Sequence, residues 1–172
     1  MQLNDHVILV DSDDNEQGTM EKVEAHKKGK LHRAFSIFVL NSKNEILLQK
    51  RSEIKYHSAG KWTNTCCSHP RYSETLEGAA HRRLKEEMGF DCELEFKFSF
   101  LYKTELDNNL IEHELDHVFI GHYDNKPKIN ILEASDWRFV SIQKIEKEIE
   151  MNPRDFSVWF LLAFVQLKKY IQ

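Results

Sequence analysis

The sequence predicts an α/β (α+β) fold with a mixed β-sheet core flanked by helices. Three observations favour this class. Strand-like segments dominate the middle of the chain, helical segments stand between and after them, and no repeat, linker or low-complexity stretch divides the 172 residues. This length suits one domain with a substantial core. We therefore expect residues 1–172 to form a single domain, with residues 1–20 as an N-terminal extension packed on or beside it.

Six segments are expected to be extended, because β-branched and aromatic residues recur in them between polar turn residues. The first two are separated by NSKN, a turn typical of a hairpin. In chain order the segments are AFSIFVL (34–40), EILLQKR (45–51), WTNTCCS (62–68), CELEFKFSFLYKT (92–104), IEHELDHVFIGHY (111–123) and WRFVS (137–141).

Three segments are expected to be helical. Residues 73–89 begin at Ser73, which can cap a helix, and end at Gly89, where a left-handed residue commonly closes one. Residues 142–150 (IQKIEKEIE) form a second helix. Residues 153–171 form a third, with a proline in its first turn, a position that tolerates the missing amide hydrogen.

Composition excludes several partners. A net charge of −4 disfavours general attraction to nucleic acid, so an anionic ligand needs a local basic cluster. The most apolar run, residues 158–165, is far shorter than the ~20 residues of a bilayer span. The acidic first residues do not resemble a signal peptide, and three cysteines suggest a reducing compartment. We expect a cytoplasmic protein with no membrane or nucleic-acid partner.

The stretch TNTCCSHP (63–70) concentrates reactive side chains. Adjacent cysteines would form a strained disulfide ring, so a disulfide is a poor interpretation. In an extended segment Cys67 and His69 share one face, whereas Cys66 faces the other way. We expect Cys66 and Cys92 to be small buried side chains. For Cys67, core filling and a chemical role both stay open.

An acidic row occupies one face of the segment 111–123. Glu112, Glu114 and Asp116 alternate along it, and apolar Val118 continues the same face. This pattern suggests carboxylates that point into a polar cavity beside the core, where they need a cation or a partner. The alternative is an edge strand with solvated charges.

Two further histidines bracket the basic stretch AHKKGKLH (25–32). Together with His69 and the two glutamates they would make a mixed imidazole–carboxylate set, comprising His26, His32, His69, Glu112 and Glu114. Such a set suits Zn²⁺ or Mn²⁺ better than Ca²⁺.

The helix 73–89 carries a further pattern. It matches most of the Nudix helix signature, whose carboxylates at helical spacing hold Mg²⁺ against a diphosphate; the matching positions are Glu74, Arg82, Glu86, Glu87, Gly89 and Phe90. Two positions differ: Ser68 replaces the leading glycine, and Arg83 replaces a glutamate. A cation at position 83 disfavours hydrolysis and favours diphosphate binding.

With LHRAFS (31–36), WTNTCCSHP (62–70) and IEHELDHVF (111–119), this altered helix resembles the type 1 isopentenyl-diphosphate isomerases, a Nudix-fold family. The resemblance extends from about Lys22 to Trp159. It implies a Nudix-like mixed sheet flanked by helices, and an isomerase acting on a small prenyl diphosphate, as a monomer or a homodimer.

The resemblance also implies roles for single residues. One divalent metal, Mn²⁺ or Zn²⁺ with Mg²⁺ as a further candidate, would be held by His26, His32, His69, Glu112 and Glu114. Cys67 and Glu114 would be the proton-transfer pair, with Tyr102 supporting the glutamate.

At the other end of the substrate, Glu87 and the backbone carbonyl of Cys67 would hold Mg²⁺ on the diphosphate. Trp159 would face the hydrocarbon end. The phosphates would be held by Lys22, Arg51, Lys55 and Arg83; each of the first three taken alone is more simply a solvated surface residue.

Two alternatives belong to other classes. A Nudix hydrolase of a nucleotide or prenyl diphosphate would use the same helix, although Arg83 disfavours it. A non-catalytic domain with a structural zinc would use the histidines, although such sites prefer cysteine-rich ligand sets.

Overall fold

The computed structural model of the protein describes residues 5–171. Nine strands form one mixed sheet: β1 (His6–Val10), β2 (Glu16–Glu21), β3 (His32–Leu40), β4 (Glu45–Arg51), β5 (Trp62–Thr63), β6 (Cys66–Ser68), β7 (Leu94–Glu105), β8 (Ile111–His122) and β9 (Ala134–Ser141). The helices are α1 (Lys22–Lys28), α2 (Leu76–Met88), α3 (Ile142–Met151) and α4 (Val158–Leu167), with short 3₁₀ turns at Asp107–Asn109 and Pro153–Asp155.

Strand β3 organises the sheet, because it uses both of its edges. It runs antiparallel to β6 on one edge and parallel to β8 on the other. Strand β7 pairs with the far side of β8, and β4 pairs with β5 and β9. The predicted mixed sheet is therefore confirmed.

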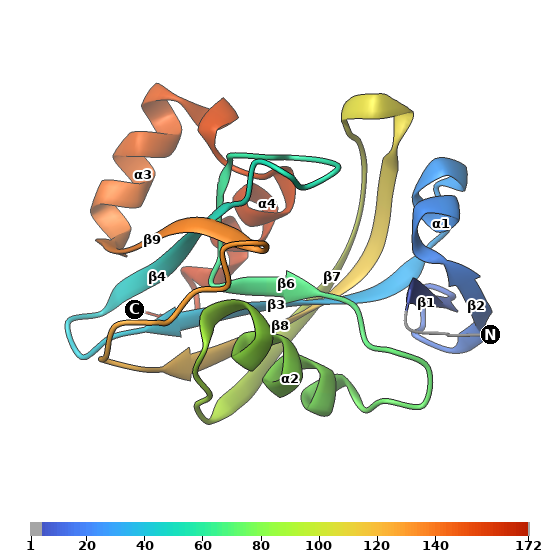
Figure 1. Ribbon diagram of the computed structural model, residues 1–172, viewed down its shortest axis with the longest axis horizontal. Helices are drawn as coiled ribbons and strands as arrows, with labels where there is room; N and C mark the ends of the chain where they lie inside the picture. The colour runs from blue at the N-terminus through green and yellow to red at the C-terminus, as the bar shows by residue number, and fades with distance from the viewer. Residues whose placement is uncertain (1–4, 172) are drawn as a thin grey trace.

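Helices cover both faces of the sheet, which Figure 1 shows with α2 in front of β3 and β8. Alternate residues of β3 face opposite layers: Phe35 and Ile37 pack in the cluster of α2, and Phe38 packs in the cluster of α4. No described helix has the length and apolarity needed to cross a membrane.

The start of α2 differs from the prediction. Thr75 is the N-cap, and its Oγ1 accepts a hydrogen bond from the amide of Gly78 at 3.1 Å. Ser73 has φ of 66°, whereas an N-cap residue is normally extended, so the Ser73 cap was wrong. The predicted end is confirmed, because Gly89 closes the helix in the left-handed region with φ of 73°.

The last helix is shorter than predicted. Pro153 opens a separate 3₁₀ turn, and Phe156 is extended, in a parallel bridge with Trp62. The amide of Ser157 donates to the Trp62 carbonyl at 3.0 Å. This tertiary bond holds residues 156–157 extended, so the α-helix begins only at Val158.

The N-terminal segment adds elements that were not predicted. Strands β1 and β2 form a hairpin that meets β3 where Leu9 pairs with His32. The Glu21 carboxylate caps α1 by accepting from the amides of Val23 and Glu24. Residues 1–4 lie outside the described residues, and the single-domain boundary stays a prediction.

Candidate active site

One pocket gathers residues that are far apart in the sequence. Its empty volume is about 520 Å³, which includes open solvent at its mouth. Its lining includes ten of the predicted site residues: Lys22, Arg51, Lys55, Cys67, His69, Arg83, Glu87, Glu112, Glu114 and Trp159. The other three, His26, His32 and Tyr102, contact this lining from behind.

Cys67 and Glu114 line the pocket from two strands that flank β3. Cys67 on β6 stands opposite Ser36, and Glu114 on β8 stands opposite His32. Cys66 faces the α2 layer and is fully buried, so the predicted alternation is confirmed. Burial raises the pKa of the Cys67 thiol to about 12, which keeps the thiol protonated at neutral pH.

The acidic row of β8 is buried. The exposed fractions are 3% for Glu112, 6% for Glu114 and 1% for Asp116, and β8 lies between β3 and β7. The interpretation as an edge strand with solvated charges is therefore wrong. Asp116 accepts a hydrogen bond from the Ser36 hydroxyl at 2.7 Å, and burial raises its pKa to about 8.

Tyr102 joins the two glutamates. Strand β7 places it opposite Glu114, and its hydroxyl lies 2.7 Å from Glu114 Oε2 and 3.1 Å from Glu112 Oε2. A hydroxyl has one proton, so it donates to one carboxylate at a time. Burial and the charge of Glu114 raise the pKa of Glu112 well above its ordinary value. Glu112 can therefore keep its own proton and donate it to the tyrosine oxygen.

Three histidines converge beside this pair. One ligand atom from each of His26, His32, His69 and Glu114 lies within 4.8 Å of all the others. The Nδ1 atoms of His26 and His32 lie 2.7 and 2.8 Å from the carbonyls of Lys22 and Lys30. A carbonyl only accepts, so both Nδ1 atoms carry hydrogen and both Nε2 atoms keep a free lone pair.

These lone pairs lie within the cluster of ligand atoms. The Nε2 atom of His26 is buried without a hydrogen-bond partner among the described residues, and the Nε2 atoms of His32 and His69 lie 3.2 Å apart. Burial lowers the pKa of His69 to about 3, so its ring is neutral. Burial opposes ionisation of Glu114, but the neighbouring His32 and His69 rings hold its pKa well below the ordinary value. Neutral imidazoles around a carboxylate fit a divalent cation.

Glu112 belongs to a second group. It lies with His26 and His57, again with one ligand atom of each within 4.8 Å of the others. His57 was missed, because a lone histidine in the irregular segment 52–61 carries no periodicity that would place it.

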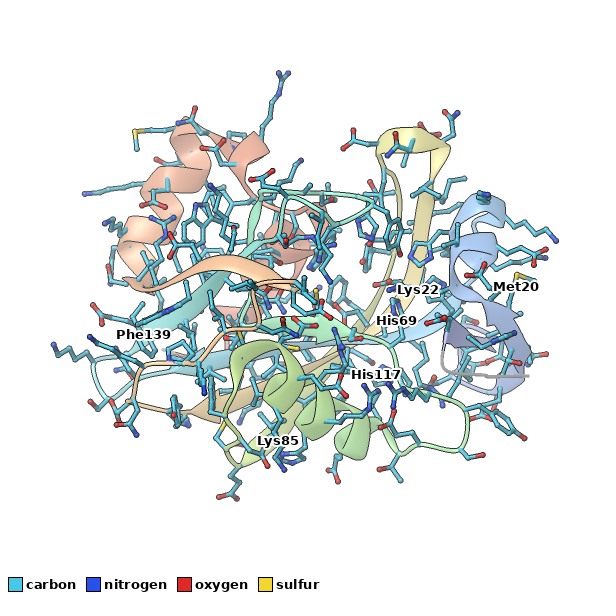
Figure 2. All side chains as sticks on the ribbon, in the orientation of Figure 1. Met20, Lys22, His69, Lys85, His117 and Phe139 are labelled. Atoms are coloured by element: carbon cyan, nitrogen blue, oxygen red, sulfur yellow. The ribbon has the colours of Figure 1, made fainter. Side chains whose placement is uncertain are left out.

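The opposite end of the pocket is basic. Arg83 contacts Glu87 one turn later on α2, at 2.5 Å, and Gln49 donates to the other oxygen of that carboxylate at 2.8 Å. Glu133 pairs with both Lys55 and Arg83. Figure 2 shows Lys22 close to His69, and Lys85 on the far side of α2.

The basic residues lie near enough to one another to repel. Burial and the charges of Lys55, Arg83 and Arg51 lower the pKa of Lys22. A second hollow shares Lys22, Lys55 and Arg83 with the pocket and adds Arg71 and Arg82. This cationic cluster in a chain of negative net charge fits a small polyanion.

Trp159 closes the pocket from α4. It is buried, the Arg51 guanidinium lies 5.0 Å from its ring centroid, and the His57 ring stands edge-on at 5.8 Å. Sequence reasoning missed four polar neighbours of the site, because each contacts it only through the tertiary fold: Ser36, Gln49, Tyr56 and Glu133.

Comparison with known proteins identifies the family of the chain. The NUDIX domain family matches residues 30–160. The isopentenyl-diphosphate Delta-isomerase 2 of Photorhabdus laumondii subsp. laumondii is 54% identical over 92% of this chain and 89% of its own length. The isopentenyl-diphosphate Delta-isomerase of Pectobacterium atrosepticum is 50% identical over 96% of this chain and 93% of its own length.

Solved structures support the fold alone. A crystal structure of a Deinococcus radiodurans protein has a TM-score of 0.71 at 16% identity, covering 85% of this chain and 89% of its own. The MutT protein of Methanosarcina mazei Go1 has a TM-score of 0.64 at 22% identity, covering 81% of this chain and 94% of its own. The chain therefore belongs to the NUDIX domain family and, within it, to the isopentenyl-diphosphate Delta-isomerases.

Proposed function

We propose that the protein interconverts isopentenyl diphosphate and dimethylallyl diphosphate, by protonation and deprotonation, as a step of isoprenoid biosynthesis in the cytoplasm. The relatives named for this reaction are about half identical over nearly the whole chain. The observation that carries the proposal is the shared pocket of Cys67 and Glu114, which approach it from strands on opposite edges of β3.

The reaction needs two groups on opposite sides of a carbon skeleton. Moving the double bond adds a proton at the terminal alkene carbon. It removes a proton from the carbon next to the methylene group that bears the diphosphate. An alkene is a very weak base, so its protonation creates a tertiary carbocation-like species. A positioned acid, a positioned base and a pocket that excludes water are therefore required.

Cys67 and Glu114 supply this pair in the proposal. The thiol is protonated and lies in the pocket, and the carboxylate is held by histidines and by Tyr102. One group donates a proton while the other accepts one, and the reverse reaction exchanges the two roles. Tyr102 orients Glu114 and can return a proton to it.

One divalent ion, Mn²⁺ or Zn²⁺ with Mg²⁺ as a further candidate, would be held by His26, His32, His69, Glu112 and Glu114. The unpartnered Nε2 atom of His26 and the facing nitrogens of His32 and His69 support this assignment. When bound, the ion withdraws electron density from the carboxyl group of Glu114 and fixes its orientation.

The diphosphate end would bind far from the reacting carbons and supply orientation energy. Glu87 and the Cys67 carbonyl would hold Mg²⁺ on the diphosphate, and the phosphates would contact Lys22, Arg51, Lys55 and Arg83. Trp159 would face the hydrocarbon end, where its indole face stabilises a nearby cation by about 1–2 kcal/mol.

Hydrolysis is the second candidate because the fold belongs to the NUDIX family. The pairing of Arg83 with Glu87 disfavours it, because a cation stands where the signature has a metal-binding carboxylate. A non-catalytic domain with a structural zinc would lose its fold on chelation and show no turnover.

Incubation with isopentenyl diphosphate and Mg²⁺ in deuterated water tests the proposal. We expect dimethylallyl diphosphate that carries solvent deuterium, detected by mass spectrometry. Release of inorganic phosphate would favour the hydrolase, and intact substrate would contradict both enzymes. Gel filtration of the same preparation distinguishes the expected monomer from the expected homodimer.

A further inference from the structure

His57 lies beside the histidine cluster although it comes from a different part of the chain. It belongs to the irregular segment between β4 and β5, yet its exposed fraction is only 7%. Its Nδ1 atom is buried and has no hydrogen-bond partner among the described residues, and its Nε2 atom faces Glu112 Oε1 at 3.9 Å, beyond hydrogen-bond distance. Burying an imidazole nitrogen without a partner costs free energy, so such an atom suggests a ligand.

The position of the His57 ring is defined by packing. The backbone carbonyl of His57 accepts a hydrogen bond from Arg51 at 3.2 Å. The ring stacks on His26 with centroids 6.0 Å apart, and stands edge-on to Tyr56 at 4.5 Å and to Trp159 at 5.8 Å. These contacts direct the ring toward the histidines, and none of them satisfies its nitrogens.

The group of His57, His26 and Glu112 is part of the centre already described. His26 belongs to both groups of ligand atoms. Its Nδ1 atom donates to the Lys22 carbonyl, so only Nε2 can bind an ion, and one lone pair serves one ion. Glu112 and Glu114 are also joined through the Tyr102 hydroxyl. The two groups are therefore two sides of one centre rather than two independent sites.

We propose that His57 is a further ligand of the divalent ion in this centre, an inference that rests on the metal site proposed above. The complete set is then four imidazoles and two carboxylates: His26, His32, His57, His69, Glu112 and Glu114. Such a set would offer the ion up to six protein donors. Imidazole-rich sets also favour Zn²⁺, Co²⁺ and Ni²⁺ over Mg²⁺.

The substitution His57→Phe tests this role, because it keeps an aromatic ring against Tyr56 and Trp159 and removes both nitrogens. Metal-stripped protein is titrated with Co²⁺, followed by visible absorption and by competition with a chelator. We expect at least a tenfold loss of Co²⁺ affinity. We also expect the visible spectrum of the bound Co²⁺ to change, because the loss of one imidazole donor changes the ligand set around the ion.

The matched control is His113→Phe. His113 lies on β8 between the two glutamates, faces away from them, and contacts the Gly29 carbonyl at 3.0 Å. The His113→Phe substitution should leave the Co²⁺ affinity and the visible spectrum unchanged. His57→Ala repeats the test without a larger ring, and melting curves of the metal-free variants verify that they fold.

The outcomes separate the two proposals. Wild-type affinity and spectrum in both His57 variants would overturn the role of His57 and leave the metal centre standing. Failure of the wild-type protein itself to bind Co²⁺ would overturn the metal centre and, with it, this inference.

Discussion

At the scale of single residues, Tyr102 provides one hydroxyl proton for two buried carboxylates. The ionised Glu114 carboxylate, which also contacts histidines, accepts the hydrogen bond from this hydroxyl. Burial and the charge of Glu114 raise the pKa of Glu112 and so favour its protonated form. Without a bound ion, this arrangement favours a protonated Glu112 beside an ionised Glu114. If Glu114 transfers a proton as proposed, that step depends on a residue that itself does not line the pocket.

We expect Tyr102→Phe to lower kcat about 10- to 100-fold, which corresponds to the loss of one buried hydrogen bond to a charged group. KM should change little, because the ring is behind the lining and the diphosphate end is untouched. Steady-state kinetics measure both constants. A kcat within twofold of the wild-type value would show that the hydroxyl does not support Glu114.

Cys67 and Cys66 form a matched pair for substitution. Cys67→Ala should lower turnover by about 10²- to 10⁴-fold, the usual contribution of a general acid or base. Cys66→Ala should keep turnover and lower the free energy of unfolding, because Cys66 packs against α2. Turnover and urea unfolding of both variants check this. Near-normal isomerisation by Cys67→Ala would refute its role in proton transfer.

Residue-level prediction succeeded where an alternating pattern places side chains on faces. The period of two along 63–70 and 111–123 separated Cys67 from Cys66 and grouped the carboxylates. His57 and Glu133 lie in irregular segments, where no period relates position to direction. Their contacts depend on how loops pack on the finished fold.

At the scale of elements, α2 depends on a close approach at its end. Gly89 has φ of 73°, and a Cβ atom added there would lie 2.3 Å from the carbonyl oxygen of Lys128. The same loop returns to the helix through hydrogen bonds from Lys128 and Asn130 to the carbonyls of Met88 and Glu87. The helix end that carries Glu87 is therefore fixed by backbone contacts.

We expect Gly89→Ala to destabilise the protein by about 2–4 kcal/mol, the sum of left-handed strain and a steric clash. Gly18→Ala is the control, because Gly18 also has positive φ but an added Cβ would meet nothing within 4 Å. The Gly18→Ala substitution should cost only backbone strain, about 1–3 kcal/mol, because φ of 117° is sparsely populated by other residues. Urea unfolding measures both, and equal losses would show that Lys128 moves aside without cost.

Element boundaries were predicted only where local chemistry decides them. Gly89 ends its helix because only glycine adopts that conformation readily. The Ser73 cap and the long last helix were wrong because both starts depend on partners distant in sequence, such as the bond from Ser157 to Trp62. The short strands β1 and β2 have too weak a pattern to be recognised without β3.

At the scale of the whole molecule, buried titratable groups couple stability to pH. Burial raises the pKa of Asp116 to about 8 and also raises that of Glu112, so the folded protein holds protons that the unfolded chain releases near pH 4. The free energy of unfolding therefore falls as pH rises from about 4 to about 8. Burial lowers the pKa of His57 to about 2 and of His69 to about 3, so stability also falls as pH drops below 6.5.

We expect the metal-free protein to lose stability between about pH 6.5 and pH 8. In this range the buried carboxyl groups release protons on unfolding, whereas the histidines are neutral in both states. Asp116→Asn should flatten this decline by up to about 1.4 kcal/mol per pH unit, the effect of one proton. Urea unfolding at the two pH values measures the slope. An unchanged slope in the variant would show that Asp116 ionises normally in the folded protein.

The order of strands could not be predicted, although most strands and the fold class could. Local pattern shows that a segment is extended, but pairing of β3 with both β6 and β8 is decided by packing over the whole chain. The family resemblance supplied the fold that local pattern could not.

The double pairing of β3 also sets how far apart the thiol and the carboxylate can be. Across the sheet their strands are separated by two hydrogen-bonded spacings, roughly 10 Å, and along β3 their partners Ser36 and His32 stand four residues, roughly 13 Å, apart. This separation cannot increase without breaking hydrogen bonds between the strands, so the distance between the thiol and the carboxylate is fixed by the sheet. Substrate analogues with bulkier branches at the reacting carbons should be rejected by the stiffness of the sheet, whatever the surrounding loops do.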